Sequence, residues 1–340
     1  MEYPGRADFS SVDFINNCLP EIKFSDIKIE CNCLGRSFRS PLYINAITGG
    51  TVLAGKVNAL LATVARESGI PMAVGSQMVA LEQPGAARSF RIIRKINPRG
   101  IVWANIGSYA DPEMACRVIN MIDANAIQIH LNVSQELMMV GGDRDFTGTL
   151  ERISAIKRDV KIPVIVKEVG FGIAREQASA LMETGIDAID ISGSGGTDFI
   201  KIERRRTKRF SFRELYGWGI PTAISIVEVH NTINGNIGLL ASGGLHNSLD
   251  IAKAISLGAS MVGMAALPLY YVMHRNAEAL IRKLKHIEDG LKMVMTMVGV
   301  KDIEELQNVP LVITGKWSEW LGKRGYDLSL YANRSGKKRI

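Results

Sequence analysis

Short apolar runs alternate with helix-like segments along most of this sequence, and no other feature restricts the fold as much. Each run ends in glycine or polar residues, and an amphipathic segment follows before the next run begins. Strands that alternate with helices at intervals of about 25 to 40 residues are typical of a parallel sheet with crossover helices. The runs predict strands at residues 41–50, 71–77, 101–108, 126–133, 163–170, 188–196, 237–245 and 261–267. Helices are predicted between them, for example over 53–69, 111–124, 147–160, 174–185 and 247–258.

Eight such units over residues 41–300 predict a (β/α)8 TIM barrel of the α/β class, whose usual size is about 250 residues. An open, doubly wound sheet is the alternative. It would carry G-x-G-x-x-G after its first strand and an acidic residue about 20 positions later, and "TGGTVLAGK" lacks this spacing. We expect a single domain, in which residues 1–40 form an N-terminal extension packed on the barrel and residues 301–340 a C-terminal extension with a basic tail.

Composition narrows the class of protein. With 46% hydrophobic and 22% charged residues, the 340-residue chain has the composition of an ordinary globular protein. It contains neither a run of about 18 apolar residues nor the start of a signal peptide, so we expect a cytoplasmic protein without a membrane partner. The four cysteines show no metal-site or disulfide pattern and are expected to be free thiols. A net charge of +7 indicates anionic partners, either phosphorylated metabolites or nucleic acid.

Polar residues are concentrated at the ends of the predicted strands. In a TIM barrel the carboxyl ends of the strands, with the loops after them, build the active site. Any one of these residues could equally be a cap or a turn residue, but so many at one end of the barrel indicate a site. They are Asn45, Thr48, Ser76, Gln77, Asn105, His130, Asn132, Lys167, Glu168, Ser192, Thr197 and Ser242.

Glycine-rich turns predict a phosphate site. "SGSGGT" (192–197) and "ASGG" (241–244) follow the sixth and seventh strands, and "GMAA" (263–266) lies at the eighth. Glycine lets backbone N–H groups approach a phosphate, and the last two loops of this fold are where one is usually bound. Lys167 within "VIVKEVG" would be desolvated in a barrel, so it should face an anionic group of a cofactor or substrate. A salt bridge to a neighbouring strand is the alternative.

The stretch "IHLNVSQELMMVGGDRDF" (129–146) carries the densest group of polar side chains. Strand alternation puts His130 and Asn132 on one face, and it puts Gln135 and Glu136 just past the end of the strand.

Together the fragments "INAITGG", "GSQM", "QIHLNVSQE", "GDRDFTG", "PVIVKEVGFG", "SGSGGTDFIKIE" and "ASGGLHNSLDIAKAISLGA" resemble the type 2, FMN-dependent isopentenyl-diphosphate isomerases. The resemblance extends from about residue 12 to about residue 325, and the order and spacing of the fragments make it specific. It implies a barrel enzyme of isoprenoid biosynthesis that isomerises isopentenyl diphosphate to dimethylallyl diphosphate. It also implies a homo-oligomer, a tetramer or an octamer.

The same resemblance assigns roles to residues. FMN would lie across the barrel mouth, with its ring and ribityl chain near Ala46, Ile47, Thr48, Ser76, Asn105, Lys167 and Ser192. The ribityl chain and phosphate would be held by Thr197, Gly243, Gly244, Ala265 and Ala266. The substrate would face His130, Asn132 and Gln135, and Glu136 would bind a Mg2+ ion that also holds the diphosphate.

The chemistry of the family requires protonation of an unactivated alkene and removal of a proton from the other side of the cationic centre. The resemblance implies that N5 of the reduced flavin is the acid and base, with NADPH needed only to reduce the flavin. We give Gln135 a positioning role, because a neutral amide is a poor general acid. His130 either binds the diphosphate or only hydrogen-bonds a neighbour.

A strongly basic segment, residues 199–219, follows the sixth strand and has seven arginines or lysines between Lys201 and Arg213. Alone it would indicate a nucleic-acid patch, but its position predicts a long loop over the barrel mouth that covers a polyphosphate. Arg205 and Arg206 would then bind substrate, and Trp218 would cover its hydrocarbon end; a solvated surface loop is the alternative.

One departure from the family concerns the beginning of the chain. Family members usually start with a further segment in which an Arg-Lys pair and a nearby His grip the diphosphate, and this sequence begins without it. A misplaced start, use of the basic loop instead, or a homologue with lost or changed activity would each explain this. Two other functions stay open: an FMN-dependent 2-hydroxy-acid oxidase, which would need a His base beside an Arg after the seventh strand, and a basic nucleic-acid-binding protein.

Overall fold

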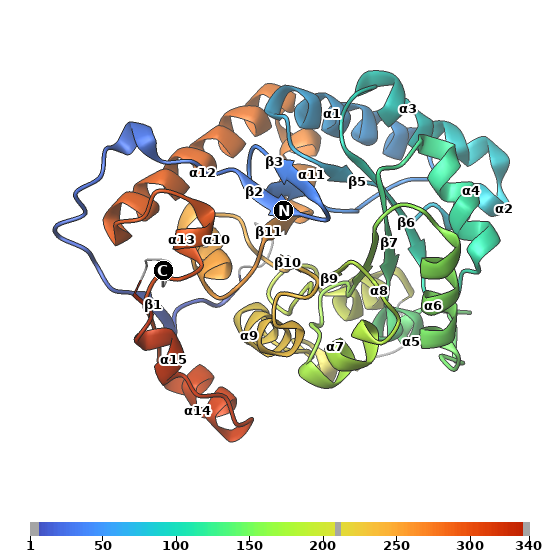
Figure 1. Cartoon of the computed structure of the whole chain (residues 1–340). Helices are drawn as coiled ribbons and strands as arrows, with labels where there is room; N and C mark the ends of the chain where they lie inside the picture. The colour runs from blue at the N-terminus through green and yellow to red at the C-terminus, as the bar shows by residue number, and fades with distance from the viewer. Residues whose placement is uncertain (1–6, 208–211, 336–340) are drawn as a thin grey trace.

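Eight parallel strands form a closed barrel in the computed structural model, which describes residues 7–207 and 212–335 (Figure 1). The middle of the basic segment and the end of the basic tail lie outside these residues. Each strand pairs with the next one along the chain, and the last pairs with the first, which confirms the predicted (β/α)8 barrel. The strands are β4 (Leu42–Ile44), β5 (Met72–Ala73), β6 (Val102–Gly107), β7 (Ala126–His130), β8 (Val164–Lys167), β9 (Ala188–Asp190), β10 (Gly238–Ala241) and β11 (Met261–Met264).

Helices surround the barrel, and all five segments named from the sequence are helical (Figure 1). Local capping explains several of their ends: the Thr51 side chain accepts a hydrogen bond from the Ala54 N–H, and Asp111 and Asn247 cap their helices in the same way. The helices after the strands are α1 (Val52–Ser68), α2 (Met78–Glu82), α3 (Arg88–Ile96), α4 (Pro112–Ile122), α5 (Val133–Met138), α6 (Thr149–Asp159), α7 (Arg175–Met182), α8 (Phe199–Thr207), α9 (Thr222–Ile233), α10 (Ser248–Ser256), α11 (Ala266–His274) and α12 (Ala277–Val298).

The strands are shorter than the apolar runs predicted. The prediction that β7 continues to residue 133 is wrong: the strand ends at His130, and Asn132 is the N-cap of α5 with φ −139° and ψ 37°. His130 and Asn132 therefore do not lie on one strand face. Asn105 and Lys167 lie within β6 and β8, whereas most of the other polar residues named from the sequence follow their strands and belong to the loops above the barrel.

The basic segment is not one long loop. Its first part folds into α8, which packs against α5, and a 3-10 turn follows at Arg213–Leu215. Ile200 and Glu203, one helical turn apart, are the buried residues of α8, and Ile200 packs with Met138 and Phe171 in a small apolar cluster. Burial of that face explains why so charged a segment is helical.

The two ends of the chain meet beside the barrel. The short strand β1 (Val12–Phe14) pairs antiparallel with β12 (Leu311–Ile313), and β2 (Cys31–Cys33) forms a hairpin with β3 (Arg36–Phe38). After α12 the chain forms α13 (Ile303–Leu306), which precedes β12. It then ends in α14 (Gly315–Lys323) and α15 (Ser329–Ala332). Near the other end, the Ala7 N–H donates to the Gly244 carbonyl at 3.0 Å, so this segment lies against a loop of the barrel mouth.

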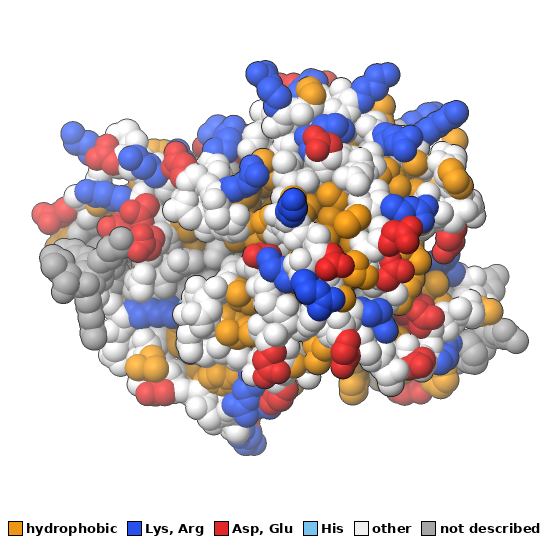
Figure 2. Space-filling view, turned by 45° about the vertical axis from the view of Figure 1, so that its right-hand side comes forward, with side chains coloured by type: hydrophobic (Ala, Val, Ile, Leu, Met, Phe, Trp, Pro, Cys, Tyr) orange, Lys and Arg blue, Asp and Glu red, His pale blue; other side chains and the backbone are white. Residues whose placement is uncertain are grey.

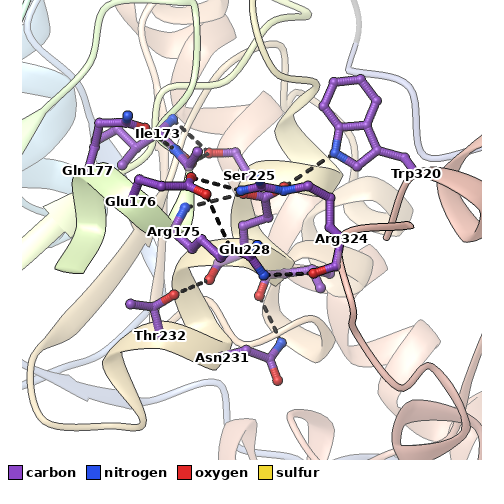
Figure 3. A network of polar contacts seen from close by, with 12 residues as sticks. Ile173, Arg175, Glu176, Gln177, Ser225, Glu228, Asn231, Thr232, Trp320 and Arg324 are labelled. Atoms are coloured by element: carbon purple, nitrogen blue, oxygen red, sulfur yellow. Dashed lines mark hydrogen bonds and ion pairs between the residues drawn. The ribbon is translucent and has the colours of Figure 1, made fainter. Parts of the chain in front are cut away.

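An ion pair between partly exposed Arg324 and buried Glu228 fixes the C-terminal segment to the barrel helices (Figure 3). The Glu228 side chain on α9 is only 1% exposed, and both its oxygens accept hydrogen bonds from Arg324, at 3.0 and 2.8 Å. Arg324 also reaches Glu176 at 2.8 Å, and its carbonyl accepts from Arg175 on α7 at 2.6 Å. Residues from α7, α9 and the end of α14 therefore form one polar cluster.

The remaining expectations from composition concern thiols, membranes and surface charge. All four cysteines are free, as predicted, and burial raises the pKa of Cys31 and Cys33 to about 12. Within the described ranges, no helix combines the length and the apolar character that crossing a bilayer requires. On the face seen in Figure 2, basic side chains are interspersed with acidic and apolar ones rather than gathered in one patch.

Candidate active site at the barrel mouth

The carboxyl ends of the eight strands meet at one rim, and the predicted cofactor residues lie there. Asn105, Lys167 and Ser192 are buried at or near the ends of their strands, and the others are partly exposed in the segments that follow the strands. Because the barrel is closed, this arrangement gathers residues as far apart in the sequence as Ala46 and Ala266. The partly exposed ones are Ala46, Ile47, Thr48, Ser76, Thr197, Gly243, Gly244, Ala265 and Ala266.

Two glycine loops lie in direct backbone contact, and the strand before the second loop, β10, pairs with β11, which leads into α11. A Cβ added at Gly196 would be 2.6 Å from the Gly244 nitrogen, and one at Gly243 would be 2.1 Å from the Gly193 oxygen. The Thr222 hydroxyl donates to the Gly243 carbonyl at 2.7 Å and fixes the second loop. No side chain of the described residues caps α11 at Ala265. Uncapped N–H groups beside two glycine loops are what a phosphate group needs.

Lys167 is 5% exposed at the end of β8, in register with Asp190 on β9. Among the described residues its ammonium has one hydrogen bond, to the Glu168 carbonyl at 2.6 Å, and no ion pair. The salt bridge considered from the sequence is therefore absent from the described part of the chain. Burial lowers the pKa of Lys167, while Asp190 and Glu168 oppose this change. Two of the three N–H donors thus remain for an occupant of the mouth.

Glu168 holds the loop after β8. One of its carboxylate oxygens accepts the N–H groups of Val169, Gly170 and Phe171, at 2.6, 2.9 and 2.7 Å. Burial raises the pKa of Glu168 to about 7, although these bonds and Lys167 pull it down. The same residue supplies the carbonyl that orients Lys167, so the loop and the lysine are coupled.

A network of buried polar side chains crosses the barrel below the mouth, and sequence reasoning missed Tyr43, Gln128 and Asp190 in it. Asp190, which is fully buried, accepts hydrogen bonds from the Tyr43 hydroxyl at 2.7 Å, the Asn45 amide at 2.8 Å and the Ser242 hydroxyl at 2.7 Å. Gln128, also fully buried, connects Asn45 with Asn105. The available signal was a polar residue at an inward position of a fully buried strand, in "AIQIH" and "AIDI".

His130 joins this network at the rim. Its Nδ1 lies 3.0 Å from the Asn105 Oδ1. Burial, and next the charge of Lys167, lower the pKa of His130 to about 3, although the backbone carbonyl of Ile106 opposes this. His130 is therefore neutral at physiological pH, and of the two roles considered from the sequence the structure shows the hydrogen bond to a neighbour.

The residues of the stretch after β7 lie together on α5 and its N-cap. Asn132 donates to the Glu136 Oε1 at 2.7 Å, and the Gln135 amide donates to Glu203 on α8 at 3.3 Å. The second Glu136 oxygen accepts the backbone N–H of Asp143 at 3.0 Å. A small pocket beside this carboxylate is also lined by Ser108, Asp143, Asp145 and Arg152. In the described ranges no three His, Cys, Asp or Glu side chains are grouped so that they could hold a metal ion, so a cation here would also depend on oxygens of its ligand.

The basic residues lie on the outside of α8 and after it. Arg205 is exposed, and Arg206 pairs with Glu203 at 3.0 Å. Trp218 is 63% exposed. Arg206 is thus linked through Glu203 to Gln135, whereas Arg205 and Trp218 face solvent.

Comparisons with known proteins agree on one family. Residues 120–312, more than half of the chain, match the family described as FMN-dependent dehydrogenase. The chain is 45% identical to an isopentenyl-diphosphate delta-isomerase of Bacillus pumilus, over 96% of this chain and 92% of that protein. An isopentenyl-diphosphate delta-isomerase of a Geobacillus species is also 45% identical, over 97% of this chain and 94% of the relative.

The chain belongs to the isopentenyl-diphosphate delta-isomerase family. Its match to an FMN-dependent family over residues 120–312 identifies the FMN-dependent, type 2 form, and the resemblance noted from the sequence is confirmed. A solved structure of mandelate oxidase with benzoyl-formic acid has a TM-score of 0.68 at 16% identity and covers 91% of this chain and 92% of its own. At that identity the likeness shows the fold alone.

Proposed function

We propose that this isomerase converts isopentenyl diphosphate to dimethylallyl diphosphate with reduced FMN and Mg2+, and that NADPH serves only to reduce the flavin. What supports the proposal is that the glycine loops, Lys167 and Glu136 all lie at or beyond the carboxyl ends of strands of one closed barrel. The names of the relatives give the substrate.

The residues present fit FMN. A phosphate group matches the backbone cradle formed by the 193–196 and 243–244 loops with the start of α11. Lys167 would direct its remaining donors at electronegative atoms of the ring, and Asn105, Ser76 and Thr48 supply polar groups around the same rim. Bound reduced FMN would supply the proton-transfer group, N5, so the isomerisation involves no net redox change.

The α5 residues would hold the substrate. Glu136 would bind Mg2+ together with diphosphate oxygens and water, which is a common way of holding this ion. Asn132 already donates a hydrogen bond to the Glu136 carboxylate and would keep one carboxylate oxygen of Glu136 directed at the metal. Gln135 would orient the alkene, because its amide is held by Glu203 at one end.

Helix α8 would close the diphosphate end of the site. Arg205 and Arg206, which are exposed on α8, would attract a polyanion and bind its diphosphate once it has entered the site. Trp218 would cover the hydrocarbon end. We also propose a homo-oligomer, a tetramer or an octamer, as the resemblance implies.

An oxidase acting on 2-hydroxy acids is a weaker candidate. It would need an arginine beside a His base after β10, but residues 237–274 contain no arginine. His246, the only histidine in that loop, has its Nδ1 2.9 Å from the Gly244 carbonyl.

The test is a turnover assay with purified protein, FMN, NADPH, Mg2+ and isopentenyl diphosphate, followed by separation of the two isomers. We expect dimethylallyl diphosphate only when FMN, reductant and Mg2+ are all present, with no continuing NADPH consumption. Absence of product under these conditions, or consumption of NADPH in step with turnover, would refute the proposal.

A further inference from the structure

A chain of hydrogen bonds runs without a break through five side chains, from the barrel centre to its rim. Asp190 accepts from the Asn45 amide at 2.8 Å, and the Asn45 carbonyl oxygen accepts from the Gln128 amide at 3.1 Å. The Gln128 oxygen then accepts from the Asn105 amide at 3.0 Å, and the Asn105 oxygen lies 3.0 Å from the Nδ1 of His130. The three amides, Asn105, Gln128 and Asn45, are all buried, and each donates its NH2 to the next group on the way to Asp190.

The direction is fixed at the buried end. Asn45 is held from both sides, because its NH2 donates to the Asp190 carboxylate and its oxygen also accepts the Ala46 backbone N–H at 2.8 Å. If Asn45 turned over, its oxygen would face a carboxylate and its NH2 would face an N–H. If Gln128 or Asn105 turned over alone, two acceptor oxygens would face each other in the buried interior. The amide orientations therefore depend on each other.

The orientation of the Asn105 amide determines which of its atoms faces the Nδ1 of His130. The Asn105 oxygen has no hydrogen to donate, so the Nδ1 of the ring must carry the proton of the bond between them. Burial and the charge of Lys167 disfavour a second proton on the ring. We propose that Gln128 is a positioning residue that, through Asn105, holds neutral His130 in the Nδ1–H form and leaves Nε2 as a hydrogen-bond acceptor at the barrel mouth.

The chemical class of the partner follows from this tautomer, and that step depends on the proposed function. An Nε2 lone pair accepts from a hydroxyl or a ring N–H and repels an anionic oxygen. His130 therefore pairs with a hydroxyl or N–H donor in the mouth, such as a flavin or an ordered water offers, and does not bind the diphosphate. Neither Gln128, which is fully buried, nor Asp190 touches that partner.

The test is the 15N spectrum of the histidine rings in FMN-loaded enzyme labelled with [15N]histidine, with the His130 signals assigned from a His130→Gln sample. We expect the Nδ1 signal at the position of a protonated nitrogen and the Nε2 signal at that of an unprotonated one. Gln128→Met removes the acceptor for Asn105, so part of the Nε2–H form should appear. Gln128→Glu is the matched control: its carboxyl group can still accept from Asn105, and the Nδ1–H form should persist.

Wild-type enzyme in the Nε2–H form, or Gln128→Met with an unchanged Nδ1–H form, would overturn the proposal. The wild-type spectrum alone can do so, even if a variant does not fold. The spectrum requires no turnover. An enzyme without isomerase activity but with His130 in the Nδ1–H form would therefore refute the proposed function and leave this inference intact.

Discussion

The contact between the two glycine loops offers a sharp test of where the cofactor phosphate binds. Gly196 has an ordinary backbone φ, so Gly196→Ala introduces no backbone strain. Its new Cβ would, however, lie 2.6 Å from the Gly244 nitrogen and 3.2 Å from the Gly243 carbonyl carbon. These are backbone atoms, so the 243–244 loop must move by several tenths of an ångström, which is enough to lengthen a hydrogen bond of about 2.9 Å beyond its useful range.

Loss of one charge-assisted hydrogen bond to phosphate costs about 1.5 to 3 kcal/mol. Because about 1.4 kcal/mol corresponds to a factor of ten, FMN should bind about 10 to 100 times more weakly to Gly196→Ala. Riboflavin, which has no phosphate, should bind the variant and the wild type equally. Fluorescence titration of the apoprotein with both flavins measures these affinities.

Gly85→Ala is the matched control, because its Cβ would meet nothing within 4 Å and its φ is also ordinary. It should leave both affinities unchanged. The reasoning fails if Gly196→Ala binds FMN within about twofold of wild type, or if riboflavin affinity falls as much as FMN affinity.

Three further predictions concern the metal, a buried carboxyl group and the C-terminal anchor. Glu136→Gln should abolish Mg2+-dependent turnover and leave FMN bound; loss of the flavin colour would place this residue elsewhere. The pKa of Glu168 is raised to about 7 in the folded protein, so its stabilising contribution is complete below the ordinary value of 4.5 and is lost as pH rises through 7. Urea unfolding at pH 5 and pH 8 should show this loss, at most about 3 kcal/mol, in wild type but not in Glu168→Gln. Arg324→Met strands the buried Glu228 carboxylate and should destabilise the fold by about 3 to 5 kcal/mol, whereas Glu176→Gln, at an exposed partner, should cost about 1 kcal/mol or less. Addition of Glu228→Gln to Arg324→Met should restore most of the loss, and an equally unstable double variant would contradict this explanation.

The order of strands and helices was predictable because it depends on local patterns. Runs such as "PVIVKEVG" are buried on both faces in a parallel barrel, and capping residues such as Thr51 and Asp111 mark helix starts. The strand ends were not predictable in the same way. The apolar pattern of β7 continues to Val133, but the barrel ladder stops at His130, where α5 begins to form.

The polar network and α8 depend on contacts between distant segments. Nothing local indicates that Gln128 joins Asn45 to Asn105, because that requires the register of neighbouring strands around a closed barrel. The run of arginines after β9 suggested a loop, since its charge hides the two buried positions, Ile200 and Glu203, that make it a helix against α5. The candidate site was thus predictable by its position at the rim, and its internal hydrogen bonding was not.

A crystal structure of the chain with bound FMN tests the central claim most directly, because that claim is the gathering of distant residues around one flavin. We expect the phosphate against Gly243, Gly244 and the start of α11, with the ring beside Lys167 and the Glu136 carboxylate facing the same space. A flavin phosphate bound away from the two glycine loops, or Lys167 and Glu136 opening to separate cavities, would contradict it.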